Sequence, residues 1–324
     1  MKVAIALDIP FLFLDLEQEY KKGVVDKMLS EYKAGRTPNP DVLCNKEIKF
    51  GHFWNFAKEY GADFIATGHY AKVARKNALS SSAEDVRSTP ASAVRDVFSP
   101  QLLLKEGQDK EKDQSYFLWT LTQEDLEHTI FPIGHLEKRA VRELARQFKL
   151  PVSDKKDSQG ICFMGDVSME DFLSHFIKSK RGKVLNTNGG VIGTHTGLIY
   201  YTIGERHGFE VKVKSASSGP FYVVAKDTKK NTLTVSDQEA EIISFSPQKL
   251  SLRDVSLSIP ALETELTARM RYRGEKLPVS LSKVGKRWIL EFAEPVRGLS
   301  LGQSVVFYDG STCLGGAVMD KVIS

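Results

Sequence analysis

Short apolar runs alternate with amphipathic stretches through the first part of the chain. Residues 9–14 (IPFLFL) predict a buried strand, and residues 20–32 predict a helix because their apolar positions recur at helical spacing. A second helix is expected over 48–60 and a second strand over 63–67, followed by a loop at 68–70. Strands and helices that alternate in this way indicate a parallel sheet with helices on its faces. Ligands of such sheets bind beyond the carboxyl ends of the strands.

Residues 77–101 hold a serine run, several alanines and two prolines with little periodicity, so we expect an inserted flexible loop there. Helical patterning returns over 113–126 and 137–148. We therefore predict an α/β domain with a helical extension over residues 1–180.

From residue 182 the pattern changes to short runs of β-branched and aromatic residues bounded by turn residues, which is typical of antiparallel sheets and barrels. A central β domain is expected over 181–245 and a second β domain over 246–324. The central strands are predicted at 191–193, 198–201, 221–224 and 232–235, and the later ones at 265–272, 278–283, 287–292 and 304–308 with a turn at 283–286.

Composition narrows the class of protein. A chain of 324 residues with 41% hydrophobic residues can form two or three domain cores, which argues against disorder, a collagen-like repeat or a disulfide-stapled miniprotein. The net charge of +4 permits an anionic partner without requiring one. No apolar run is long enough for a membrane helix, and Asp8 follows the start too closely for a signal peptide, so we expect an untargeted, soluble protein.

Three cysteines are too few for a secreted disulfide framework, so a reducing compartment is favoured. Cys44 follows a proline-rich loop at 37–41 and precedes a predicted helix with lysines, which would favour a thiolate; a buried, inert cysteine is the alternative. Cys162 lies between glycines and close to two lysines, although it could also fill an apolar gap. Cys313 has no nearby base and is assigned to packing.

Three further groups of polar residues could contact a ligand. His69 follows a predicted strand directly, where a histidine can touch a phosphate or a base, or be merely a satisfied polar residue. Asp113 and Ser115 could be helix caps. Arg269, Arg271 and Arg273 would share one face of a strand, either as phosphate contacts or as a solvated face.

Seven strings, in order along nearly the whole chain, resemble those of the tRNA-specific 2-thiouridylase family, whose members put sulfur on the wobble uridine of tRNA. The strings are GRTPNPD (35–41), CNKEIKF (44–50), ATGHYA (66–71), KDQSYFL (112–118), KDSQGICF (156–163), YTIGERHG (201–208) and LSLGQ (299–303). The resemblance implies an adenine-nucleotide α-hydrolase-like (PP-loop) domain, a small central β module and a C-terminal β-barrel.

The resemblance also implies a mechanism. ATP, with Mg²⁺ expected beside it, adenylates the C2 oxygen of uridine, and a persulfide on Cys162 attacks C2. Cys44 is the second catalytic thiol and releases the sulfur, ending in a disulfide with Cys162. A sulfur-relay protein supplies the persulfide, no permanently bound metal is expected, and the close match to bacterial members favours the cytoplasm.

Other site residues follow from the same match. Asp41 is expected beside the target base as an acid or base. Gly68 is expected to contact ATP. The implied contacts with the base or the rest of the tRNA are Asn39, Pro40, Asp41, His69, Lys112, Asp113, Gln114, Arg271, Tyr272 and Gln303.

The chain departs from the family at its start, where members carry a Ser-Gly-Gly-Val-Asp-Ser type loop that binds ATP phosphates through backbone amides. No matching string occurs, so we expect a nucleotide-binding domain that is truncated at its start and that binds ATP weakly or not at all. Two other functions stay open. One is a non-catalytic tRNA-binding remnant, and the other is a dithiol redox protein that binds no RNA.

Overall fold

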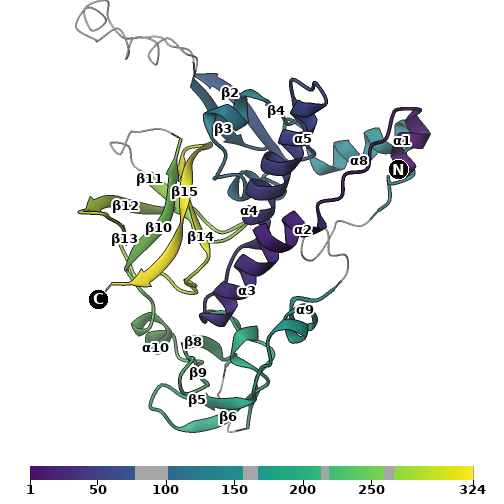
Figure 1. The fold of residues 1–324 in the computed structure, drawn as a ribbon. Helices are drawn as coiled ribbons and strands as arrows, with labels where there is room; N and C mark the ends of the chain where they lie inside the picture. Colours follow the sequence, from purple (N-terminus) through teal and green to yellow (C-terminus); the bar gives the residue numbers. More distant parts are fainter. Residues whose placement is uncertain (77–100, 156–166, 213–218, 259–265, 324) are drawn as a thin grey trace, which may run out of the picture.

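The computed structural model describes residues 1–76, 101–155, 167–212, 219–258 and 266–323. Helices and short strands of the first half lie beside a β-barrel formed mainly by the C-terminal part, and a small sheet lies at the other end of the molecule (Figure 1). The predicted α/β unit followed by two β modules is confirmed. The inserted loop predicted at 77–101 lies outside the described residues except for Gln101, which begins a strand.

Two nearly continuous helices form the first unit, as the periodicity over 20–32 and 48–60 predicts. The first consists of α2 (Glu17–Tyr20), η1 (Lys21–Val25) and α3 (Asp26–Lys33), and the second of α4 (Pro40–Leu43), η2 (Cys44–His52) and α5 (Phe53–Glu59). Asn39 caps the second helix, because its side-chain oxygen accepts a bond from Val42 N, and Pro40 occupies the first helical position.

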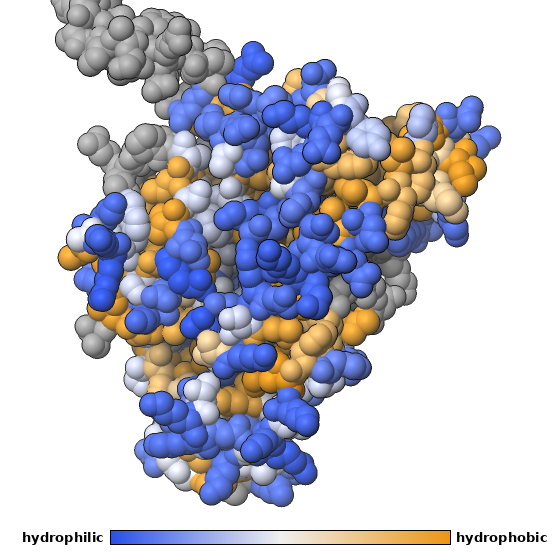
Figure 2. Space-filling view, viewed as in Figure 1, coloured by the Kyte–Doolittle hydropathy of each residue, from blue (hydrophilic) through white to orange (hydrophobic). Residues whose placement is uncertain are grey.

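The strand predicted at 9–14 is wrong. After α1 (Lys2–Leu7) these residues have no regular structure, and Phe11, Leu12 and Phe13 are 53%, 63% and 81% exposed. An apolar patch on the space-filling surface marks this N-terminal region (Figure 2). An apolar run becomes a strand only where a neighbour accepts its backbone hydrogen bonds, and none of the described sheets includes this segment.

The predicted strand at 63–67 is present as β1 (Ile65–Ala66), and it pairs in parallel with β4 (Thr129–Ile130). The predicted helix at 137–148 is α8 (Lys138–Gln147). The helix predicted over 113–126 is wrong, because only η3 (Ser115–Phe117) and α7 (Gln123–Glu127) form there. The apolar side chains between them, Leu118, Trp119 and Leu121, are buried by tertiary packing rather than along one helix face.

The central module contains a five-stranded sheet in the order β7-β6-β5-β9-β8. Its pairs are antiparallel except β5 with β9, which are parallel, so the sheet is mixed. A strand predicted at 198–201 is instead the 3-10 turn η4 (Leu198–Tyr200). The other elements are α9 (Met169–Phe176), β5 (Gly182–Leu185), β6 (Val191–His195), β7 (Glu210–Val211), β8 (Tyr222–Asp227), β9 (Thr232–Ser236) and α10 (Glu239–Ser244).

Six antiparallel strands form the predicted C-terminal barrel in the order β10-β13-β12-β11-β14-β15. The barrel closes because β10, which pairs with β13, also pairs with β15. Two earlier strands, β2 and β3, extend the same sheet from β15. The strands are β2 (Ala71–Lys76), β3 (Gln101–Glu106), β10 (Lys249–Leu257), β11 (Leu266–Arg269), β12 (Leu277–Val284), β13 (Arg287–Phe292), β14 (Ser304–Asp309) and β15 (Thr312–Val322).

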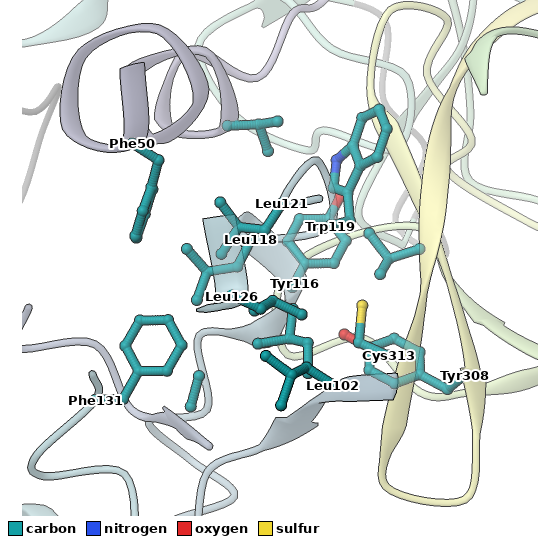
Figure 3. Packing of buried hydrophobic residues seen from close by; sticks show 14 of the residues in the cluster. Phe50, Leu102, Tyr116, Leu118, Trp119, Leu121, Leu126, Phe131, Tyr308 and Cys313 are labelled. Atoms are coloured by element: carbon teal, nitrogen blue, oxygen red, sulfur yellow. The ribbon is translucent and has the colours of Figure 1, made fainter. Parts of the chain in front are cut away.

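One hydrophobic core joins the first unit to the barrel. Tyr116 and Trp119 pack with Tyr308 and Cys313 in this cluster (Figure 3). The Tyr116 hydroxyl donates to the Ser304 carbonyl at 2.9 Å, and Trp119 Nε1 donates to Ser304 Oγ at 3.1 Å. Cys313 is 2% exposed, and burial raises the pKa of its thiol to about 12, in agreement with the packing role predicted for it.

Candidate functional site

The loop at residues 37–41, which precedes α4, lies directly against the barrel. Thr37 N donates to the Leu301 carbonyl at 2.9 Å, and Gln303 Nε2 donates to the Pro38 carbonyl at 3.1 Å. Gly302, between these two barrel residues, has φ +93°, and a Cβ there would lie 3.0 Å from the Thr37 carbonyl oxygen. The barrel therefore fixes the backbone of this loop through a close approach that needs glycine.

The central module reaches the same place. Thr37 Oγ1 lies 3.5 Å from Thr202 Oγ1, and the carbonyl of Ile203 accepts a bond from Ser300 Oγ at 3.5 Å. A Cβ on Gly204 would lie 2.9 Å from Gly298 Cα. Three segments that are remote in sequence, 35–41, 201–208 and 298–303, thus meet at one junction, which we call the three-segment junction.

Asn39, Pro40 and Asp41 begin the helix at this junction. Asn39 and Asp41 are partly buried, and Asp41 lies in the first helical turn. Tyr116 accepts a side-chain hydrogen bond from Asn39, and burial raises the pKa of this tyrosine, so its hydroxyl stays protonated. The role of these residues as base contacts, which the resemblance implies, stays a prediction.

Cys44 lies three residues after Asp41 on the same helix and is completely buried, packed with Val24 and Ile48. The prediction of a helix that begins after Cys44 is wrong, because the helix begins at Pro40. Cys162 lies outside the described residues, so the geometry between the two thiols stays a prediction.

His69 is 6% exposed, between Phe50 and Phe131, whose ring centroids lie 5.9 and 6.0 Å from its own. Its Nδ1 is 2.8 Å from Thr67 Oγ1, and its Nε2 is 3.5 Å from Lys49 Nζ. Burial, together with the Lys49 charge, lowers the pKa of His69 to about 3. This histidine is therefore neutral at physiological pH and is largely covered.

Gly68 lies just beyond the carboxyl end of β1, where ligands of parallel sheets bind. It is exposed, and no atom lies within 4 Å of the position that a Cβ would occupy. A nucleotide could approach this backbone closely, so the position suits the predicted ATP contact.

Asp113 is buried and serves the fold. Its carboxylate accepts bonds from Gly107 N at 2.9 Å and from Ser115 Oγ at 2.9 Å, and it pairs with Arg269 Nη1 at 2.9 Å. The same guanidinium pairs with Glu106 at 3.0 Å. The expectation that Asp113 or Ser115 caps a long helix is wrong, because the carboxylate closes a turn and an ion pair across two modules.

The neighbours of Asp113 differ in exposure. The side-chain oxygen of Gln114 accepts a hydrogen bond from the Tyr70 backbone N–H at 3.0 Å, and the Gln114 backbone N–H donates to the Tyr70 carbonyl at 2.9 Å. Gln114 therefore fixes the loop after Gly68. Lys112 is partly exposed and lines a groove of about 480 Å³.

The predicted arginine stripe is only partly present. β11 ends at Arg269, so Arg269, Arg271 and Arg273 do not share one strand face. The Arg269 side chain is only 15% exposed and is held in ion pairs. Arg271 is exposed, and Tyr272 packs on Phe117 with ring centroids 4.6 Å apart. A surface contact with RNA is therefore compatible with Arg271 but not with Arg269.

Sequence reasoning missed the side chains that position the loop at 37–41. Arg36 pairs with Glu31 through two bonds of 2.7 and 2.6 Å, and Arg253 pairs with the same carboxylate at 2.7 Å. Glu31 and Arg253 are 222 positions apart, so no local pattern could have joined them. Gly302, by contrast, was within a family-like string.

The described part of the chain contains no group of three histidine, cysteine or acidic side chains placed to hold a metal ion. None of the helices within these same ranges is long and apolar enough to cross a membrane.

Three family models match the chain in succession. Residues 1–166 match the tRNA methyl transferase HUP domain, residues 170–237 the tRNA methyl transferase PRC-barrel domain, and residues 248–319 the aminomethyltransferase beta-barrel domain. The matches agree with the order of an α/β unit, a small central module and a barrel.

Curated relatives carry the name tRNA-specific 2-thiouridylase MnmA. The relative from Streptococcus thermophilus (strain CNRZ 1066) is 41% identical over 322 residues, which are 98% of this chain and 81% of the relative. Those from Stenotrophomonas maltophilia (strain K279a) and Lactococcus lactis subsp. cremoris (strain MG1363) are 43% and 42% identical, over 97% and 98% of this chain and 78% and 80% of each relative.

Proposed function

Since this chain belongs to the tRNA-specific 2-thiouridylase family, we propose that it transfers sulfur to C2 of the wobble uridine of tRNA in an ATP-dependent reaction. The observation that carries the proposal is the three-segment junction. The loop with Asn39, Pro40 and Asp41 donates one hydrogen bond to the barrel, accepts another from it and lies against the central module. A base drawn out of the anticodon could therefore meet a rigid backbone there.

Adenylation is the first proposed step. The C2 oxygen of uridine attacks the α-phosphorus of ATP, which releases pyrophosphate and converts a poor leaving oxygen into AMP. Gly68 offers an open backbone for the nucleotide, and Mg²⁺ would accompany the phosphates. Asp41 is the proposed acid or base beside the uridine N3 proton.

Sulfur transfer follows. The terminal sulfur of a Cys162 persulfide, loaded by a persulfide donor protein, attacks C2 and displaces AMP. The Cys44 thiolate then attacks Cys162 Sγ, so the S–S bond breaks, its electron pair stays on the sulfur bound to C2, and a Cys44–Cys162 disulfide forms. Because Cys44 is completely buried, this step requires the surrounding helices to admit the second thiol.

The proposed tRNA contacts differ in how they would act. Lys112, Arg271 and Gln303 are not fully buried, and they could reach RNA directly. His69 and Asp113 are buried, and Gln114 and Tyr272 make the contacts described above, so these four would act mainly by shaping the surface.

Mass spectrometry of the wobble nucleoside tests the proposal, in tRNA incubated with the chain, ATP and a persulfide donor. We expect 2-thiouridine from the parent chain, and none with Cys162→Ser, with Cys44→Ser or without ATP. Cys313→Ala is the matched control, because the pKa of this thiol, about 12, excludes a thiolate at neutral pH.

Other outcomes separate the alternatives. Thiolation that survives Cys162→Ser would refute the role of that residue. Salt-dependent tRNA binding without thiolation would instead favour the non-catalytic tRNA-binding protein, and absence of RNA binding would favour the dithiol redox protein. Calorimetric titration with ATP tests whether the chain binds this nucleotide.

A further inference from the structure

We propose that the groove along α8, which we call the α8 groove, binds the phosphate backbone of the tRNA away from its reacting base. The proposal rests on the proposed function, because it assumes that tRNA is the substrate. It assigns a second contact region to that substrate, on a helix that none of the family-like strings contains.

Charge is the first argument. Five cationic side chains and one carboxylate line the α8 groove, so the net charge of its lining is +4. The whole chain has the same net charge. Such concentration of one sign attracts a polyanion and raises its association rate. The lining residues are Lys112, Lys138, Arg139, Arg142, Glu143 and Arg146.

Position is the second argument. Lys138 Nζ lies 5.6 Å from the centre of the Tyr70 ring, next to Gly68 and His69. The Lys138 amide donates to Asp109 Oδ2 at 2.9 Å, and the Gln108 amide donates to the Gly134 carbonyl at 2.9 Å. The helix start is therefore tied to the segment that carries Lys112, and one end of the α8 groove, at Lys138, lies close to the loop that follows Gly68.

Length favours an RNA strand over a mononucleotide. Lys138, Arg142 and Arg146 recur every four residues, so they follow one side of the helix over about 12 Å. The phosphates of one nucleotide cannot reach all three, whereas successive phosphates of a strand can.

The helix is also available for a partner. No residue of α8 is buried, so it adds little to any core. Arg139 pairs with Glu143 at 3.3 Å and Arg146 with Asp154 at 3.2 Å, but the side chains in these pairs are between 54% and 89% exposed. Such exposed pairs are worth little and can be exchanged for phosphate contacts.

The salt dependence of tRNA binding tests the proposal. The affinity of the full chain for tRNA would be measured between 50 and 200 mM salt by fluorescence anisotropy, for the parent, Arg142→Ala and Arg139→Ala/Arg142→Ala. Lys286→Ala, at the exposed turn between β12 and β13, is the control for loss of one charge. Circular dichroism would verify that each variant is folded.

We expect the affinity ratio between the two salt concentrations to decrease about threefold for each lost phosphate contact, with no change for Lys286→Ala. Equal slopes for the parent and both groove variants would overturn the proposal, while tRNA binding by the parent would leave the proposed function intact. Loss of ATP binding with unchanged tRNA slopes would also overturn it, because the α8 groove would then hold nucleotide phosphates.

Discussion

Several polar residues near the candidate site are buried, and this burial determines how they can act. His69 contacts Thr67 Oγ1 and lies close to the Lys49 ammonium, while Asp113 is paired with Arg269. A buried polar group that has partners stabilises one arrangement of its surroundings. These side chains therefore shape the loops that could bind the substrate.

His69 makes stability depend on pH. Its pKa is about 3 in the folded chain, against an ordinary value near 6.5, so below pH 6.5 the unfolded chain binds a proton that the folded chain does not. The contribution of neutral His69 to the free energy of unfolding is present above pH 6.5 and is lost as the pH falls towards 3. We expect a loss of about 2 kcal/mol between pH 6.5 and 5 from this residue alone.

Urea unfolding at pH 7.5, 6.0 and 5.0 measures this effect. Between pH 7.5 and 5.0, the free energy of unfolding of His69→Gln should decrease by about 2 kcal/mol less than that of the parent. His52→Gln, which removes an exposed histidine of η2, should decrease as the parent does. Parallel curves for His69→Gln and the parent would contradict the lowered pKa.

At the scale of elements, periodic sequences were predicted well and tertiary pairing was not. The helices over 20–32, 48–60 and 137–148 have repeating apolar positions, and all three are present. The predicted strands of the second β domain end at residue 308, so β15 was not among them. Its Gly315 permits close approach of two strands, since a Cβ at Gly315 would lie 2.1 Å from the Ser256 carbonyl oxygen.

The candidate site shows the same limit. The family-like strings indicated the loop at 37–41 and Gln303, because these residues belong to short local strings. The pairing of Asp113 with Arg269 joins residues 156 positions apart, so only the fold could show that a predicted RNA contact is an internal ion pair.

Gly302 tests how the barrel positions the loop at 37–41. In Gly302→Ala the new methyl group would meet Arg36 Cβ and the Thr37 carbonyl, each at 3.0 Å, so the loop must move. We expect a lower melting temperature and a thiolation rate at least tenfold lower. Gly285→Ala is the matched control, since Gly285 also has positive φ (+62°) but open space around it.

The control separates backbone strain from the contact. Both variants should lose about 1 kcal/mol through positive φ, whereas only Gly302→Ala should also lose activity. Similar thiolation rates in the two variants would show that the loop tolerates displacement.

At the scale of the whole molecule, one carboxylate joins the first unit to the barrel. Glu31 on α3 binds both Arg36 and Arg253, and Arg253 also lies 3.8 Å from Asp320 of β15. The hydrogen bond from Arg36, with the charges of both arginines, lowers the pKa of Glu31. This ion cluster is only partly exposed, so solvent screens it less than a surface pair.

Glu31→Gln should reduce the free energy of unfolding by about 1–2 kcal/mol at pH 7, because two arginines lose their shared partner. Since the pKa of Glu31 is lowered, this difference should be fully present above pH 4.5 and decrease as the pH falls from 4.5 through the lowered pKa. Urea unfolding at pH 7 and pH 4 measures the change. Glu59→Gln, at an exposed position of α5, should have no comparable effect.

The pairing of β15 has a consequence for synthesis on the ribosome. This last barrel strand along the chain pairs with β10, β14 and β3, and β3 belongs to the first unit. Until β15 emerges from the exit tunnel, the barrel cannot close and β3 keeps an open edge. Such edges invite aggregation, so a translational pause shortly before residue 312 would lengthen the time during which the nascent chain needs chaperones.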